Sequence, residues 1–194
     1  NCSGKHAAFL ATCKKMNWPL DSYLKGDHPL QVEIFRIVSE LLEIPLSEIN
    51  AERDDCGAPT LYLKLLEMSK LYSLLSSSEN AELEQISRAI TTNPIMISDN
   101  NKFDTEIIKA SHGQVIGKGG AEGIQCLCKV NEGIGLALKV EDGSKRAKHA
   151  VSLHLLKQLE WISDLRVQDI EEKIFNFSQG VRIEVKGQLK FQES

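Results

Sequence analysis

The sequence predicts an α+β fold in which a helical lobe packs on an antiparallel sheet with a C-terminal helix. Helical periodicity dominates the first half of the chain, and tight turns between short apolar runs dominate the second half. Helices followed by antiparallel strands are typical of α+β folds. We therefore expect a mainly helical lobe over residues 1–95 and a sheet lobe over residues 96–194, with a small-ligand site in the cleft between them.

The helical lobe is expected to contain at least three helices. Apolar residues recur at helical spacing over residues 30–41, and Pro45 ends this pattern. A second apolar stripe covers residues 61–75 and follows Thr60, whose hydroxyl can cap a helix N-terminus. The spacing of apolar residues predicts a shorter helix over residues 76–90.

The sheet lobe is expected to contain an antiparallel hairpin. Apolar runs at residues 124–130 and 135–140 flank the tight turn Asn131-Glu132-Gly133. A second turn precedes Ser144, which we interpret as the N-cap of a long helix with an apolar face. A helical patch follows around residues 170–174. Beyond it, period-two alternation predicts a last strand through Val181, Ile183 and Val185.

Composition and charge exclude several classes of protein. The chain has 194 residues, a formal net charge of −4 and no long basic run, whereas a nucleic-acid-binding protein carries a basic stripe. No stretch approaches the ~18 apolar residues of a membrane span. The five cysteines are scattered and odd in number, which suits a reducing compartment better than a secreted disulfide framework. We expect a cytoplasmic protein that binds neither nucleic acid nor membrane.

The first candidate site is the N-terminal segment Asn1-Cys2-Ser3-Gly4-Lys5-His6. A phosphate-binding loop would need Ser or Thr after the lysine, and His6 stands there instead. If a helix begins here, Cys2 and Lys5 lie three residues apart on one face and could hold one ion. The alternative is a buried thiol beside a solvated lysine, which the local sequence favours because isolated cysteines are often buried.

The second candidate site is the segment Arg53-Asp54-Asp55-Cys56-Gly57-Ala58-Pro59-Thr60. Two carboxylates and a thiol stand together before a glycine-proline turn, and such turns often carry functional groups. The alternative is that Asp54 and Asp55 are solvated loop charges and that Cys56 belongs to the core. The local sequence favours this alternative.

The third candidate site is the glycine-rich run from Gly117 to Gly123. A dinucleotide-binding fingerprint would need glycine at the sixth position, where Glu122 stands. What remains is Lys118 at the start of a glycine run, where the absence of side chains would let a substrate approach the backbone. The alternative is a loop whose glycines only satisfy turn geometry. Cys126 and Cys128, two apart on a predicted strand, are expected in the core.

Four segments and Phe103-Asp104-Thr105 together resemble, in order, blocks of the rhizobial-type L-asparaginase (asparaginase II) family. The four are Asn1-Cys2-Ser3-Gly4-Lys5-His6, Asp27-His28-Pro29-Leu30-Gln31, Asp54-x-Cys56-Gly57-Ala58-Pro59 and Lys118-Gly119-Gly120-Ala121-Glu122-Gly123. The resemblance implies a fold similar to that of serine β-lactamases and glutaminases, and hydrolysis of L-asparagine to aspartate and ammonia. Glutamine or a related amide is an alternative substrate, because Asp55, Asp99 and Lys102 depart from the family pattern.

The resemblance also implies roles for individual residues. Family members bind zinc through two cysteines and a lysine, which correspond here to Cys2, Cys56 and Lys5. Asp54 would then orient water or ligand beside the metal. Lys118 corresponds to a strand lysine that shares a proton with a nucleophilic serine, and is the expected catalytic residue. The expected substrate-binding residues are Gly119, Gly120, Ala121, Glu122 and Asp54.

The chain begins without an initiator methionine, so we expect it to be the C-terminal part of a longer protein. The nucleophilic serine and its Ser-x-x-Lys pair are expected in the missing N-terminal segment, which makes that segment a partner and leaves this chain inactive by itself. The resemblance also implies a homodimer. The alternative function is a non-catalytic module that binds a metal or a small ligand on the same fold.

Overall fold

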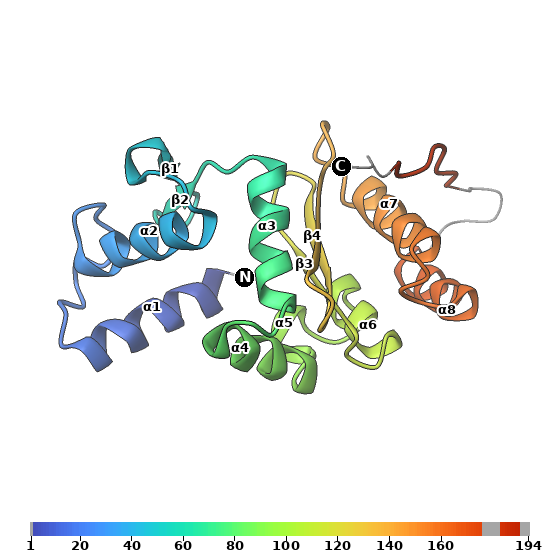
Figure 1. Ribbon diagram of the computed structural model, residues 1–194, viewed down its shortest axis with the longest axis horizontal. Helices are drawn as coiled ribbons and strands as arrows, with labels where there is room; N and C mark the ends of the chain where they lie inside the picture. Colours follow the sequence, from blue (N-terminus) through green and yellow to red (C-terminus); the bar gives the residue numbers. More distant parts are fainter. Residues whose placement is uncertain (1, 176–182, 191–194) are drawn as a thin grey trace. The chain divides into compact units, whose positions relative to one another are not determined.

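The computed structural model describes residues 2–175 and 183–190. Contacts divide the chain into two compact units, Asn1–Glu67 and Met68–Ser194. Helices and small antiparallel sheets make this an α+β protein, as the sequence predicts (Figure 1). Among the described helices, none has the length and apolar character needed to cross a membrane. A separate lobe over residues 1–95 stays a prediction.

The first unit consists of helices followed by a small hairpin. Helices α1 (Cys2–Met16) and α2 (Pro29–Leu42) precede a 3-10 helix (Leu46–Glu48). Strands β1 (Ala51–Arg53) and β2 (Pro59–Leu61) then pair antiparallel.

The buried imidazole of His28 fixes the start of α2. Its Nδ1 accepts a hydrogen bond from the Leu30 backbone N–H at 3.1 Å, and Pro29 occupies the first turn, where no donor is needed. The helix ends at Leu42, before Glu43 in the left-handed conformation. The helix predicted over residues 30–41 is confirmed.

The helix predicted over residues 61–75 is wrong at its N-terminal end. Thr60 lies in β2, opposite Glu52, and is not a helix N-cap. The Tyr62 N–H extends the hairpin by donating to the Asn50 carbonyl at 2.8 Å. Because these hydrogen bonds satisfy the backbone as a strand, helix α3 begins only at Leu65 and runs to Ser76.

The second unit contains a three-stranded antiparallel sheet in the order β3-β4-β5. Its strands are β3 (Val115–Gly119), β4 (Ile124–Lys129) and β5 (Ile134–Lys139). The β4–β5 pair is the predicted hairpin, and its turn has Asn131 and Gly133 at positive φ.

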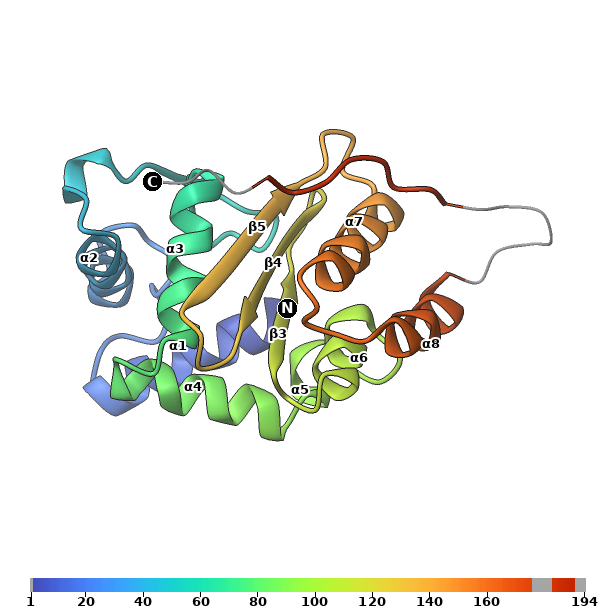
Figure 2. The same cartoon turned by 45° about the vertical axis from the view of Figure 1, so that its right-hand side comes forward.

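Helix α3 covers one face of this sheet (Figures 1 and 2). It lies so close to β5 that a Cβ at Gly135 would collide with the Ser69 carbonyl oxygen. The Ser73 hydroxyl also donates to the Gly133 carbonyl at 2.5 Å. Helices α4 (Ala81–Thr92) and α5 (Ile95–Ser98) follow, and α4 contains most of the helix predicted over residues 76–90.

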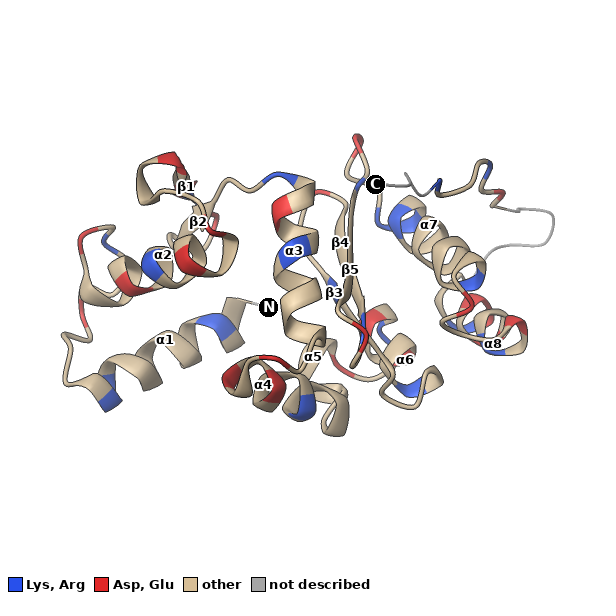
Figure 3. Cartoon of the chain, in the orientation of Figure 1, with Lys and Arg blue, Asp and Glu red and all other residues tan. Residues whose placement is uncertain are grey.

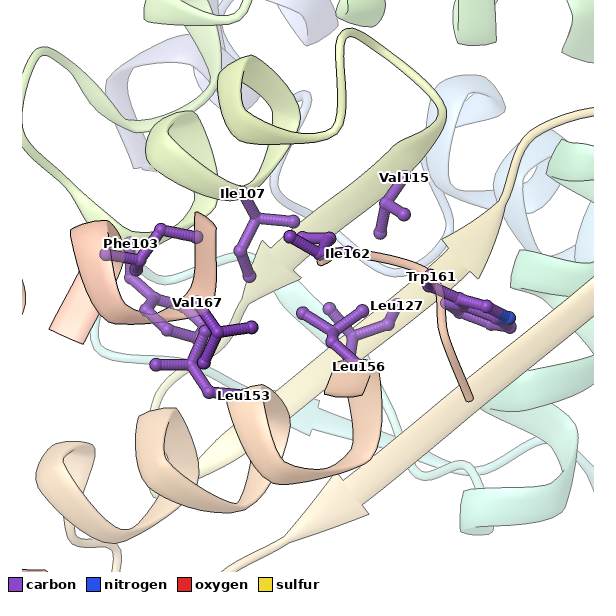
Figure 4. Close-up of a cluster of buried hydrophobic side chains, with 10 residues drawn as sticks. Phe103, Ile107, Val115, Leu127, Leu153, Leu156, Trp161, Ile162 and Val167 are labelled. Carbon is purple, nitrogen blue, oxygen red and sulfur yellow. The ribbon is translucent and has the colours of Figure 1, made fainter. Parts of the chain in front are cut away.

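The other face of the sheet holds the main hydrophobic core. Helices α6 (Phe103–Ala110), α7 (Lys145–Gln158) and α8 (Asp164–Ile174) supply this core together with β3, β4 and the segment that joins α7 to α8. Figure 4 shows the apolar side chains of this core, which lie between the sheet and the helices. The buried cluster comprises Phe103, Ile107, Val115, Leu127, Leu153, Leu156, Trp161, Ile162, Val167 and Ile170.

The C-terminal predictions are partly confirmed. Ser144 caps α7 by accepting from the Ala147 N–H at 3.2 Å. The predicted last strand is wrong at Ile183 and Val185, which belong to no strand in the described structure, and Val181 lies outside the described residues. No strand among the described residues pairs with residues 183–190. The Gln158 side chain instead exchanges hydrogen bonds with the Leu189 backbone at 2.8 and 2.9 Å.

Candidate functional site

The first group of predicted site residues lies within the first unit, around the Lys5–Asp54 ion pair. Lys5 projects from the first turns of α1, and Asp54 begins the turn between β1 and β2. The side chains are 33% and 25% exposed, so water has limited access to the pair. The Lys5 ammonium, aided by backbone N–H groups, lowers the pKa of Asp54 to about 2.

The turn from Asp54 to Ala58 is built around the Asp54 carboxylate. Its Oδ1 accepts from the Cys56 N–H at 2.9 Å and from the Ala58 N–H at 3.0 Å. Gly57 has φ +80°, a left-handed conformation that favours glycine. These requirements explain the Asp-x-Cys-Gly-Ala pattern as a turn that holds Cys56 at a defined position beside Asp54.

Within the first unit, the fold places Cys56 beside Cys2. A hydrogen bond between their thiols, together with burial, raises the pKa of Cys56 above its usual value, and Asp54 and Lys5 lie within electrostatic range. Both cysteines are free, Cys2 exposed and Cys56 half-buried. The alternatives that the local sequence favoured, a core position for Cys56 and a buried thiol for Cys2, are therefore wrong. The fold gathers Cys2, Lys5, Asp54 and Cys56 into one group.

The chemistry of this group depends on the lysine. Among the described residues, no three His, Cys, Asp or Glu side chains form a metal-binding group. Lys5 adds a nitrogen donor to the group, and its amine donates a hydrogen bond to Asp54.

His28 and Gln31, from the segment Asp27-His28-Pro29-Leu30-Gln31, hold the loop that contacts α1 through Tyr23. His28 Nε2 lies 3.0 Å from the Pro19 carbonyl, and Gln31 Nε2 donates to the Tyr23 carbonyl at 2.7 Å. The Tyr23 hydroxyl in turn lies 2.8 Å from Nδ1 of His6. This chain of contacts supports the start of α1, on which Cys2 and Lys5 lie, and the sequence pattern did not reveal it.

The second group of predicted residues lies in the second unit, at the end of β3. Lys118 pairs with Cys126 on β4, so their side chains lie on the same face of the sheet. Its half-buried amine donates to the Gly119 carbonyl at 2.6 Å. Gly120, Ala121 and Glu122 are exposed in the turn from β3 to β4, and Glu122 has φ +53°.

The sequence motifs missed two buried polar residues near this turn. Gln125 on β4 and Lys148 on α7 are buried, and both lie close to Gly119 together with Asp104. The signal for Gln125 was a polar residue inside an apolar strand. Asp104 belongs to the Phe103-Asp104-Thr105 segment, in which Phe103 stacks on His149 and Thr105 donates to the Pro94 carbonyl at 3.0 Å.

The two strand cysteines belong to the core, as predicted. Burial raises the pKa of Cys126 to about 11 and that of Cys128 to about 12. Both thiols are therefore protonated at neutral pH and poor nucleophiles.

One Ser-x-x-Lys spacing occurs in the chain, at Ser22-Tyr23-Leu24-Lys25. These residues lie in turns and bends, and Lys25 is exposed. On a helix this spacing would place the serine and the lysine on one face, and residues 22–25 are not helical. The segment is therefore not the helical Ser-x-x-Lys pair that the resemblance implies.

Charged residues of both signs are spread over the helices of each unit (Figure 3). This distribution agrees with the absence of a basic stripe in the sequence and gives no support to a nucleic-acid-binding surface.

Both groups of predicted site residues lie within a match to a known protein family. A family model described as L-asparaginase II matches residues 1–191. A comparison with curated proteins finds no match. Because the family match extends over nearly the whole chain, this chain belongs to the L-asparaginase II family.

Proposed function

We propose that this chain is the C-terminal part of an L-asparaginase, which hydrolyses the side-chain amide of L-asparagine to aspartate and ammonia. The observation that carries the proposal is the family match over residues 1–191. The family implies an amidohydrolase, and asparagine is its expected substrate. Cytoplasmic location and a homodimer are part of the same proposal and rest on the resemblance alone.

Lys118 is the proposed proton carrier. A serine hydroxyl attacks the amide carbonyl carbon and its proton passes to the neutral lysine amine. The resulting ammonium returns the proton to the departing nitrogen, which leaves as ammonia. Water then cleaves the ester, with the amine taking a proton from the water and returning one to the serine. The half-buried position of Lys118 at the end of β3 supports this role.

The serine is proposed to come from an N-terminal segment, in a fold like that of serine β-lactamases and glutaminases. Two features support this fold: β3 is an edge strand of the described sheet, and helices cover both sheet faces.

Zinc is the proposed metal, with Cys2, Cys56 and Lys5 as its ligands. Two thiolates and an amine form a donor set that suits zinc and leaves one position for water or substrate. When bound, zinc would supply a Lewis acid. Lys5 must lose its proton to bind the metal, and it now donates that proton to Asp54. The displaced proton would pass to solvent, and the Asp54 carboxylate would orient a ligand.

The direct test is ammonia release from L-asparagine, with L-glutamine in parallel, by the full-length reading frame and by residues 1–194. We expect release by the full-length protein and none by residues 1–194. Turnover by residues 1–194 would show that the nucleophile lies within them. No release by folded, zinc-supplied full-length protein would contradict the proposed reaction and favour a non-catalytic module that binds a metal or a small ligand.

A matched pair of lysine variants tests the role of Lys118. Lys139 on β5 is a useful control, because its amine donates to the next carbonyl at 2.6 Å as the amine of Lys118 does. We expect Lys118→Met to lower kcat by at least about 100-fold, the usual size of a general-base contribution. Lys139→Met should retain nearly full activity. Equal activities in the two variants would contradict the assignment.

A further inference from the structure

Three buried polar side chains surround the end of β3 on the face opposite Lys118. Asp104 of α6 is 6% exposed, Gln125 of β4 is 0% exposed and Lys148 of α7 is 4% exposed. Buried charges are costly unless they are paired and hydrogen-bonded. Their arrangement therefore has to be specific, and all of its contacts lie within the second unit.

Asp104 binds the backbone of β3 directly. Its Oδ2 accepts from the Gly119 N–H at 2.8 Å, and its Oδ1 accepts from Gln125 Nε2 at 2.8 Å. The Gly120 N–H donates to the Ile124 carbonyl, so in the alternating antiparallel pattern the Gly119 N–H faces away from β4. Asp104 thus takes the place of a neighbouring strand at this edge.

Lys148 binds the turn that follows. Its amine donates to the Gly120 carbonyl at 3.1 Å and to the Ile124 carbonyl at 3.0 Å, which closes the turn from β3 to β4. Asp104 and Lys148, from two different helices, therefore fix the peptide groups on either side of the Gly119–Gly120 peptide. The first turn of α6 adds a favourable dipole for the Asp104 carboxylate.

Gly119 is the point on which the three side chains converge. A Cβ at this position would lie 2.7 Å from Lys148 Nζ, 3.1 Å from Gln125 Oε1 and 3.4 Å from Asp104 Oδ2. Within the described residues Gln125 Oε1 has no hydrogen-bond partner. The polar side chains thus fill the space that a side chain at position 119 would need.

Lys118 is the residue next to these fixed peptides. Because side chains alternate along a strand, its amine lies on the opposite face from Gly119. A twist of the Gly119 peptide would redirect that amine. We infer that Asp104 is a positioning residue for Lys118, and that it aims the amine by holding the Gly119 N–H. This inference rests on the proposed catalytic role of Lys118.

A second buried carboxylate on α6 provides a matched control. Glu106 is 4% exposed and pairs with Lys173 of α8 at 2.8 Å, away from the β3 edge. Both Asp104→Ala and Glu106→Ala remove a buried acid from the same helix, and both should lower the stability of the protein. A role of Asp104 in packing alone would leave both variants with the same activity per folded molecule.

The experiment measures kcat and KM for L-asparagine in the full-length enzyme, corrected for the folded fraction. We expect Asp104→Ala to lower kcat roughly 10- to 100-fold with little change in KM, since small misplacements of a catalytic group cost factors of this size. Glu106→Ala should keep the kcat of the original enzyme. Unchanged kcat in Asp104→Ala, or equal losses in both variants, would overturn the inference.

Amide hydrogen exchange at Gly119 separates this inference from the proposed reaction. Asp104→Ala should accelerate exchange of the Gly119 N–H relative to Glu106→Ala, whether or not the protein releases ammonia. Full-length protein that is inactive, but whose Gly119 N–H is protected by Asp104, would refute the proposed reaction and leave the backbone contact standing. Equal exchange in the two variants would refute the contact itself.

Discussion

Lys5 illustrates how one side chain can take part in two different interactions. As an ammonium it forms an ion pair with Asp54, and as an amine it could complete a metal site with Cys2 and Cys56. A lysine amine has a pKa of about 10.4 in water, so proton and metal compete for the same lone pair. Occupancy of the proposed site should therefore fall as the pH is lowered.

The zinc proposal predicts the effects of single substitutions. We expect one zinc per chain, lost in Cys56→Ala and Cys2→Ala and weakened in Lys5→Met, as measured by metal analysis after dialysis. Cys13→Ala is the matched control, because Cys13 is a buried thiol of the same unit without a role in the group. Full zinc occupancy in both Cys56→Ala and Lys5→Met would mean that the ligands are other residues.

His149 predicts a pH dependence of stability. Its ring stacks on Phe103, with centroids 4.0 Å apart, and burial followed by the Lys148 charge lowers the pKa of His149 to about 4. The unfolded chain takes up this proton near pH 6.5, before the folded chain does. The contribution of His149 to the free energy of unfolding is therefore present above pH ~6.5 and is lost as the pH falls to ~4.

The measurement is urea unfolding at pH values on either side of this window. His149→Phe keeps an aromatic ring for stacking and removes the titrating group, so its stability should fall less with decreasing pH. His154→Phe, on the same helix, should keep the pH dependence of the original protein. A His149→Phe variant that loses as much stability as the original would exclude His149 as the source.

At the scale of the element, local patterns predicted those helices and strands whose hydrogen bonds are local. The helix over residues 30–41 and the β4–β5 hairpin carry their own capping and turn residues, so the sequence was sufficient. The helix predicted from residue 61 failed because Leu61 was in phase with the helical stripe while its backbone paired with Ala51. Apolar periodicity indicates which face of a segment is apolar, but it does not indicate whether another strand lies close enough to pair with that segment.

The contact between α3 and β5 yields a prediction for the second unit. A Cβ at Gly135 would collide with backbone atoms of Ser69 and Ser73, which cannot move without shifting the helix. Gly135→Ala should therefore lower the free energy of unfolding by about 1–3 kcal/mol, as overpacking does. Gly26→Ala is the control, because no atom lies within 4 Å of a Cβ there. If both variants unfolded at the same midpoint concentration of urea, this packing would be contradicted.

At the scale of the whole molecule, the family could be predicted from the order of short motifs. The groups of polar side chains around Cys56 and around Asp104 could not be predicted from the local sequence. It favoured a buried thiol for Cys56 and gave no partner for Asp104. Asp104 and Lys148 come from helices on either side of the hairpin in the sequence, and only the fold brings them to Gly119. Buried polar residues inside apolar patterns, such as Gln125, were the available signal.

The hydrogen bond from the Gly119 N–H to Asp104, at the end of β3, also bears on association between copies of this protein. An unpaired strand edge offers its N–H groups to any extended chain, and such pairing is a route to aggregation. At Gly119 the Asp104 carboxylate already accepts that N–H, and a negative charge lies where an incoming carbonyl oxygen would have to approach. The residue that we infer to aim Lys118 therefore also blocks edge-to-edge assembly at this end of the strand.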